Sequence, residues 1–331
     1  MATRYYSISE KLKNEYGRKI YKLSLSSGCT CPNRDGKLSN KGCSFCSEGG
    51  SGDFAAPFLS VSEQIELAKE KVAGKMGKDA GKNVPHCDGK ALQGGEDSRD
   101  TGDGRKERNL SYIAYFQSFT NTYGDTKRLK KLYSEAINHP DVAILSLGTR
   151  PDCLEEDKLD MLSELRKIKP VWVELGLQTV HQKTAEKINR CYALPVFEKA
   201  YAELKKRGIE VIIHVILGLP GEGREDMLET VRYISNLKPA PDGVKLQLLH
   251  IMRGTRLAEE YEKEPFHILT LPEYAGLITD CLTILPEETA VHRITGDAPK
   301  KLLIEPLWSA DKKRVLNYLN SKIREWEKSR T

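Results

Sequence analysis

The fold of this 331-residue chain is decided by residues 142 to 177, which read VAILSLGTRPDCLEEDKLDMLSELRKIKPVWVELGL. Apolar runs at 142–147 and 171–177 have the length and the β-branched content of buried strands. Between them, residues 155–168 repeat apolar side chains at helical spacing. This order of strand, helix and strand predicts two parallel strands joined by a crossover helix.

The same alternation extends over most of the chain. Further strands are predicted at 22–27, 110–117, 209–217 and 243–249, and further helices at 59–73, 125–140, 181–189, 195–207 and 223–236. Six strands separated by helices indicate a parallel sheet, and six units are too few to close an eight-stranded barrel. The sequence therefore predicts an α/β fold, an open partial (β/α)6 barrel of the TIM type.

We expect the barrel to span residues 1–254 and an α-rich C-terminal extension, 255–331, to pack on it as a cap. The extension has predicted helices at 272–284 and 310–328 around a short H-R-I-T-G-D segment at 292–297. Within the barrel, residues 74–108 hold eight glycines and fifteen charged residues. So few aliphatic side chains cannot offset the entropy of ordering, which predicts a disordered insertion.

Composition narrows the classes of protein further. Hydrophobic residues make up 39% of the chain and charged residues 30%, and no apolar run approaches 18 residues, which argues against a membrane partner. The first residues lack the apolar segment of a secretion signal, so we expect a cytoplasmic protein. Lys and Arg exceed Asp and Glu by 52 to 47, a balance that permits a polyanionic partner without requiring one.

Four of the eight cysteines, Cys29, Cys31, Cys43 and Cys46, lie within 18 positions, which indicates a metal site in a reducing compartment. Two sites fit: a four-thiolate zinc site, or an iron–sulfur cluster held by three cysteines with one open iron. One residue separates Cys29 from Cys31, so on extended chain their side chains point to opposite faces. The spacing favours Cys31, Cys43 and Cys46 as a trio, and the zinc alternative stays open.

Glycine-rich polar motifs follow the predicted strands. In order they are CTCPNRDG with GCSFC, QSFTNTYG, GTRPDC, GLQT, GLPGE and LLHIMRGT. In barrels of parallel strands the functional side chains gather at the carboxyl ends of the strands. We therefore expect these motifs to form a ligand-binding rim.

Taken together, CTCPNRDG, GCSFC, YFQSFTNTY, GTRPD, ELGLQT and HVILGLPGE resemble the radical S-adenosylmethionine (SAM) family of the YhcC/YtqA type. That family is related to the radical domain of the elongator acetyltransferase subunit. The resemblance runs from about residue 5 to the P-L-W segment near 308. It implies a radical SAM partial barrel with a [4Fe–4S] cluster held by Cys31, Cys43 and Cys46. The open iron would bind SAM, whose reduction yields methionine and a 5′-deoxyadenosyl radical.

The resemblance also assigns residues around SAM. They are Phe45 beside the last cluster ligand, Gln117, Ser118, Thr120 and Asn121 near the methionine amino group, Glu174 and Gln178 in the motif of the fourth strand, Arg190 for a carboxylate, and His214 and Leu217 near ribose and adenine. Arg190 has a structural alternative, a salt bridge to Glu186 on its own helix. Glu174 stands within an apolar strand, where a carboxylate is costly unless it is paired.

The resemblance further implies a substrate, the wobble uridine in the anticodon loop of tRNA, converted from its 5-carboxymethylaminomethyl to its 5-aminomethyl form. The implied partners are a flavodoxin- or ferredoxin-type electron donor and a SAM-dependent tRNA methyltransferase acting downstream. Arg150 and Arg253 follow strand ends and are candidates for holding the substrate carboxylate. Two alternatives remain: a radical enzyme for a small metabolite or a protein, and a zinc-stabilised RNA-binding protein.

Overall fold

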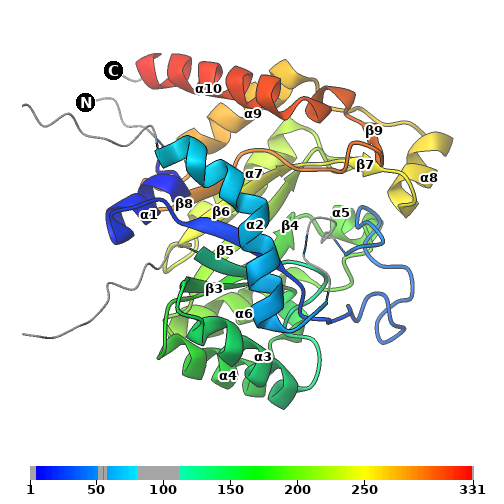
Figure 1. Ribbon diagram of the computed structural model, residues 1–331. Coiled ribbons are helices and arrows are strands. Elements are labelled where there is room, and N and C mark those ends of the chain that lie inside the picture. The colour runs from blue at the N-terminus through cyan, green and yellow to red at the C-terminus, as the bar shows by residue number, and fades with distance from the viewer. Residues whose placement is uncertain (1–4, 51–54, 56–57, 81–111, 330–331) are drawn as a thin grey trace, which may run out of the picture.

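The computed structural model describes residues 5–50, 55, 58–80 and 112–329. Its main feature is one parallel sheet with the strand order β1-β2-β3-β4-β5-β6-β8. The strands are β1 (Tyr21–Leu25), β2 (Tyr112–Phe116), β3 (Val142–Thr149), β4 (Val171–Gln178), β5 (Glu210–Leu217), β6 (Gly243–Leu248) and β8 (Ala290–Arg293). The sheet curls without closing (Figure 1), which confirms the predicted partial barrel.

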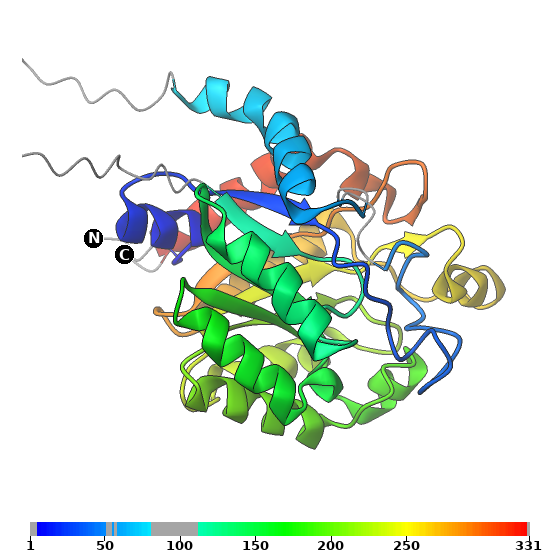
Figure 2. The ribbon, with the colours of Figure 1, turned by 60° about the horizontal axis from the view of Figure 1, so that its bottom comes forward.

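Helices cover the outer face of the curled sheet (Figure 2). They are α2 (Val61–Ala80), α3 (Thr126–Asn138), α4 (Glu156–Arg166), α5 (Gln182–Lys187), α6 (Leu194–Lys206) and α7 (Arg224–Ser235). In α3 the predicted apolar stripe is buried, and Asp125 caps the first turn by accepting from the backbone N–H of Arg128. The main hydrophobic core lies between these helices and the outward side chains of the strands.

Helix α2 is longer than the sequence indicated. It continues to Ala80, so the prediction of a disordered insertion is wrong for residues 74–80. The rest of that predicted insertion, residues 81–108, lies outside the described residues.

Helix α1 (Ile8–Tyr16) lies at the amino ends of the strands. Ser7 caps it by accepting from the N–H of Glu10, and Gly17 ends it at a φ of 66°. Leu12 of this helix packs with Ile113 and Trp172 in a small second core. Helix α1 therefore lies against the bottom of the half-barrel.

The C-terminal segment contributes more to the barrel than expected. Strand β8, within the region predicted to be a cap, pairs in parallel with β6, so the sheet has seven strands rather than six. The remaining elements are β7 (Ile251–Met252), α8 (Arg256–Lys263), α9 (Leu271–Ile284), β9 (Leu303–Glu305), η2 (Leu307–Ala310) and α10 (Lys312–Ser329). Helices α9 and α10 match the two predicted helices, whereas α8 was not predicted. No helix within the described part of the chain has the length and apolar character needed to span a membrane.

Candidate functional site

The inner face of the half-barrel lines a cavity of about 800 Å³. Alternate residues of each strand face it, as the pleat of a strand requires. Facing the cavity are Lys22 and Ser24 of β1, Ile113 and Tyr115 of β2, Glu174, Gly176 and Gln178 of β4, His214 and Ile216 of β5, and Lys245 and Gln247 of β6. Several of these residues are polar, so the inside of the half-barrel is a polar cavity while its outer face is the apolar core.

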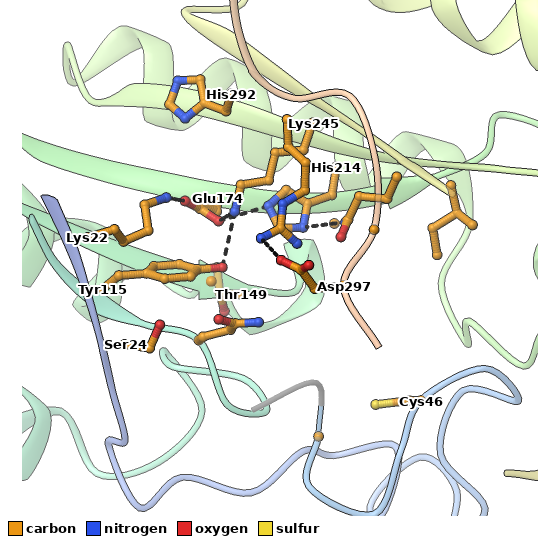
Figure 3. A pocket seen from close by; sticks show the side chains of 18 of the residues that line it. Lys22, Ser24, Cys46, Tyr115, Thr149, Glu174, His214, Lys245, His292 and Asp297 are labelled. Atoms are coloured by element: carbon orange, nitrogen blue, oxygen red, sulfur yellow. Dashed lines mark hydrogen bonds and ion pairs between the residues drawn. The ribbon is translucent and has the colours of Figure 1, made fainter. Parts of the chain in front are cut away.

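The loop between β1 and α2 separates the four clustered cysteines into two groups. Cys31, Cys43 and Cys46 line the cavity, and Figure 3 shows Cys46 at its edge. Cys29 instead packs in the main core, where its Sγ accepts from the guanidinium of Arg128 at 3.2 Å. The structure therefore brings together the trio that the spacing favoured.

Hydrogen bonds hold this cysteine loop in place. Asn33 Nδ2 lies 3.4 Å from Cys43 Sγ and donates to the carbonyl of Asn189 at 2.6 Å. The Arg34 guanidinium donates to the carbonyl of Cys46 at 2.8 Å. Burial and the neighbouring Cys46 raise the pKa of the Cys43 thiol to about 12. Cys43 thus becomes a thiolate when a metal replaces its proton.

The distances between sulfur atoms separate the two metal alternatives. A single tetrahedral zinc ion, with Zn–S bonds of about 2.3 Å, needs sulfur atoms about 3.8 Å apart. Among the described residues, no three of these cysteines bring their Sγ atoms within 4.8 Å of one another. A cluster with a separate iron for each sulfur accepts the wider spacing, so the three thiols fit an iron–sulfur cluster better than a zinc ion.

Across the cavity from Cys46, the carboxylate of Glu174 is the centre of an ionic cluster (Figure 3). We define this ionic cluster as Lys22, Tyr115, Glu174, His214 and Lys245. Glu174 Oε1 accepts from Lys22 Nζ at 2.8 Å, and Oε2 lies 2.9 Å from His214 Nε2 and in contact with Lys245 Nζ. The Lys245 ammonium also donates to the Tyr115 hydroxyl at 3.2 Å. The carboxylate of the fourth strand is therefore fully paired although it is fully buried.

Burial and the neighbouring charges together determine the protonation states of Glu174, His214 and Lys245. Burial alone would raise the pKa of Glu174, but the charges of Lys22 and Lys245 outweigh burial and hold that pKa well below its usual range. Burial, reinforced by Lys245, lowers the pKa of His214 to about 4. Burial also lowers the pKa of Lys245 to about 7, against the attraction of Glu174. At neutral pH, Glu174 is ionised and His214 is neutral.

Comparison with known proteins places this site in a family. A model of the radical SAM superfamily matches residues 94–234, and a model of the radical SAM C-terminal domain matches residues 241–325. The uncharacterized protein YtqA of Bacillus subtilis is 38% identical over 320 residues, which cover 97% of this chain and 89% of YtqA. The chain belongs to the radical SAM superfamily.

Two further relatives agree with this membership. Protein YhcC of Escherichia coli is 32% identical over 298 residues, covering 90% of this chain and 85% of YhcC. The solved structure of an N-terminally truncated Elp3 from the archaeon Methanocaldococcus infernus superimposes with a TM-score of 0.59 at 17% identity. That superposition covers 89% of this chain and 63% of Elp3, and it supports the shared fold.

Membership in the radical SAM superfamily confirms several predictions from the sequence. The protein is an enzyme, and its cofactors are those of the superfamily, a [4Fe–4S] cluster and SAM. The relationship to the elongator radical domain is confirmed as well. The alternative of a zinc-stabilised binding protein without catalysis is thereby wrong.

Of the residues assigned to SAM in this radical SAM barrel, Phe45, Gln117, Thr120 and Gln178 line the cavity. Gln178 has a left-handed φ of 70°, and its buried Oε1 has no hydrogen-bond partner. A Cβ at Gly176 would lie 2.9 Å from Gln178 Nε2, so glycine at 176 leaves room for this amide. A buried amide oxygen without a hydrogen-bond partner is costly. We therefore expect Gln178 Oε1 to accept a hydrogen bond from a ligand.

Three other assigned residues lie outside the cavity lining. Asn121 binds the chain itself: its Nδ2 donates to the carbonyls of Phe116 and Gly148, and its Oδ1 accepts from the Ser27 hydroxyl. Ser118 is buried next to this loop and is also absent from the lining. Leu217 points into the outer core, because the alternation that directs His214 inward also selects Ile216. The side chains of Ser118, Asn121 and Leu217 thus have structural contacts in this fold, and their roles near SAM stay predictions.

Arg190 lines the cavity and also binds the backbone after β4. Its buried guanidinium donates to the carbonyls of Leu177, Thr179 and Tyr192 at 2.6 to 3.0 Å. These contacts take the place of the alternative salt bridge to Glu186, and the role of Arg190 toward a carboxylate stays a prediction. Arg190 orders the loop that carries Asn189, which in turn accepts from Asn33 of the cysteine loop.

The two arginines predicted to hold a substrate carboxylate are also placed differently. Arg150 lines the cavity but forms a double hydrogen bond with Asp152, at 2.9 and 2.7 Å, and its NH1 lies 4.0 Å from Cys43 Sγ. Arg253 is exposed on a turn and lies outside the lining. Lys22 and Lys245 of the ionic cluster are further cations of the cavity lining.

Proposed function

We propose that this radical SAM enzyme modifies the wobble uridine of tRNA, converting its 5-carboxymethylaminomethyl group to a 5-aminomethyl group. The observation that carries the proposal is one cavity lined both by the three cysteines and by two lysines, the half-buried Lys22 and the buried Lys245. Such a cavity suits a cofactor together with a substrate that projects an anionic group inward. The sequence relationship to Elongator complex protein 3, from which the resemblance implied this substrate, supports the proposal.

Each part of the cavity has a task in this proposal. Cys31, Cys43 and Cys46 would hold the cluster, and Gln178 would bind SAM beside it. When bound, the two cofactors supply a 5′-deoxyadenosyl radical, and SAM is overall the two-electron oxidant. The carboxymethyl carbon next to nitrogen would lose a hydrogen atom and then an electron, the nitrogen would lose its proton, and water would cleave the resulting C=N bond to release glyoxylate. The nitrogen stays on the aminomethyl base.

A base of the anticodon loop reaches a buried site only after it leaves its stack. The seven-stranded sheet does not close into a barrel, and we propose that a flipped base enters the cavity without a rearrangement of its strands. Other parts of the proposal are a flavodoxin- or ferredoxin-type electron donor, a tRNA methyltransferase acting on the product, and a cytoplasmic place of action. A small metabolite or a protein is the competing substrate class.

The proposal is tested on the tRNA nucleosides of a strain that lacks the gene. We expect 5-carboxymethylaminomethyluridine to accumulate and 5-aminomethyluridine and its methylated product to disappear. The wild-type gene should restore the pattern, and Cys46→Ala should not. An unchanged nucleoside profile would contradict tRNA as the substrate while leaving the radical SAM assignment intact.

A further inference from the structure

The cavity has two chemically different ends. One end carries the cysteine trio with Gln117 and Gln178, and the other carries the ionic cluster around Glu174 (Figure 3). The ionic cluster lies below the strand ends, inside the half-barrel, where barrels of this type commonly have a packed apolar core. Neither the cysteine loop nor the rim motifs account for it.

The ionic cluster has an excess of positive charge when Lys245 is protonated. It then holds two ammonium groups, from Lys22 and Lys245, and one carboxylate, from Glu174, while His214 is neutral. Asp297, the other acidic residue in the described lining of the cavity, is already paired with Arg293 at 3.1 Å and with Lys312 at 2.6 Å. One positive charge is therefore left without a partner, and one anionic group would neutralise it.

The ring of Tyr115 lies next to both ammonium groups. Lys22 Nζ and Lys245 Nζ lie 4.3 and 4.7 Å from the centre of its ring. Cation–π contacts orient an ammonium without using up its N–H donors. Of its three N–H donors, Lys22 uses one on Glu174, and Lys245 uses two, on Glu174 and on the Tyr115 hydroxyl, so each ammonium keeps at least one donor for a further acceptor.

We propose that Lys22 and Lys245 bind the carboxylate of the substrate, with Glu174 as the residue that positions them. This inference rests on the proposed function and names the part of the enzyme that recognises the carboxymethylamino group. A carboxylate anchored there places the adjacent CH2 group between the ionic cluster and the cysteine trio. An aminomethyl product has no carboxylate, so it loses this anchor and is released.

Proton linkage gives the proposal a signature that a purely structural cluster lacks. Free Lys245 has a pKa of about 7, lowered by burial, by Lys22 and by Arg293, and raised by Glu174. A bound carboxylate favours the charged form and raises that pKa. Above about pH 7, ligand binding is therefore expected to take up a proton, and affinity is expected to fall as pH rises.

The test compares two anticodon stem-loop RNAs that differ in one group, one with 5-carboxymethylaminomethyluridine and one with 5-aminomethyluridine. Binding to the reconstituted holoenzyme is measured by calorimetry near pH 8 in two buffers of different ionisation enthalpy. N-methylglycine, which is the carboxyl end of the substituent alone, is titrated as a third probe. The variants are Lys22→Met and Lys245→Met, each of which leaves Glu174 paired with the other lysine and His214.

Lys205→Met is the matched control. Lys205 on α6 is similarly shielded and ion-paired, to Asp242 at 2.6 Å, but it lies outside the cavity. We expect the wild type to prefer the carboxylate RNA about 10- to 100-fold. The preference and the proton uptake should be lost in Lys245→Met and kept in Lys205→Met, with the preference also reduced in Lys22→Met. Urea unfolding of each variant shows whether it is folded.

The outcomes separate this inference from the proposed function. Lysine-dependent binding of N-methylglycine without discrimination between the RNAs would retain the carboxylate site and overturn tRNA as the substrate. Equal binding of both RNAs, with no lysine-dependent binding of N-methylglycine, would overturn the carboxylate site and leave the ionic cluster as a structural element. Should one lysine variant fail to fold, the other variant and the proton uptake of the wild type decide the question.

Discussion

Lys22 Nζ lies 2.8 Å from Oε1 of Glu174, which joins the first and the fourth strand across the inside of the half-barrel. The same carboxylate accepts from Ser146 of β3 at 3.1 Å and contacts His214 and Lys245 on β5 and β6. One side chain therefore connects strands on both sides of the curl. Its loss would affect stability as well as ligand binding.

Glu174→Ala is expected to destabilise the protein by about 3–5 kcal/mol, because it leaves the buried Lys245 without its counter-ion and also removes the partner of the half-buried Lys22. Urea unfolding measures the change in free energy. Glu186→Ala is the control, since Glu186 is exposed and should contribute less than about 0.5 kcal/mol. Equal stability of the two variants would show that Glu174 does not hold the strands together.

Acid should destabilise the protein through its buried histidines. Burial lowers the pKa of His250 to about 4, so the folded state keeps this ring neutral where the unfolded chain binds a proton. Stability is therefore lost as pH falls below about 6.5, by about 2 kcal/mol at about pH 5 for this residue. His250→Gln, which retains a partner for the Ser309 hydroxyl, should reduce the slope of unfolding free energy against pH. An unchanged slope would contradict the assignment.

The glycine of the H-R-I-T-G-D segment has a packing role. A Cβ at Gly296 would overlap the ring of His250 and would lie 3.0 Å from the carbonyl oxygen of Leu248. Gly296→Ala should therefore cost about 1–3 kcal/mol of unfolding free energy. Gly276→Ala on α9 is the matched control: it meets nothing within 4 Å and should stabilise the helix by about 0.5–1 kcal/mol. The same sign for both variants would contradict this account of Gly296.

Cys29 and Cys31 are separated by one residue and should behave differently. Cys31 faces the cavity, whereas Cys29 lies in the core against Arg128. After anaerobic reconstitution, Cys31→Ala should lose most of its iron and its brown colour, and Cys29→Ala should keep both. Iron and sulfide analysis of the purified variants measures the difference. Loss of iron in Cys29→Ala alone would contradict this account, because Cys29 would then be the cluster ligand and Cys31 the structural cysteine.

Most strands of the sheet could be predicted from the sequence, because long apolar runs such as 171–177 indicate a buried strand without any knowledge of the tertiary structure. Strand β8 does not, since four residues that include His292 and Arg293 carry too little apolar pattern. It becomes a strand because β6 offers it a free edge, and because Gly243 leaves room for His292. Its formation is a tertiary effect.

The cysteine trio was predictable because its spacing is local, whereas the ionic cluster was not. In the segment K-L-S-L, Lys22 alternates with Leu23 in the pattern of a strand with one face in water. Alternation assigns Lys22 and Leu23 to opposite faces but does not say that the polar face lines a cavity. In β6, Lys245 alternates with Val244 and Leu246 in the same way. Contacts with Glu174 arise only when the sheet curls.

The central claim is that the cysteine trio supports radical chemistry on SAM. The most direct test is anaerobic reconstitution with iron and sulfide, followed by addition of dithionite and SAM and measurement of 5′-deoxyadenosine. We predict that the wild type forms 5′-deoxyadenosine and that Cys46→Ala forms none. A colourless wild-type protein that binds zinc and yields no 5′-deoxyadenosine would contradict the account.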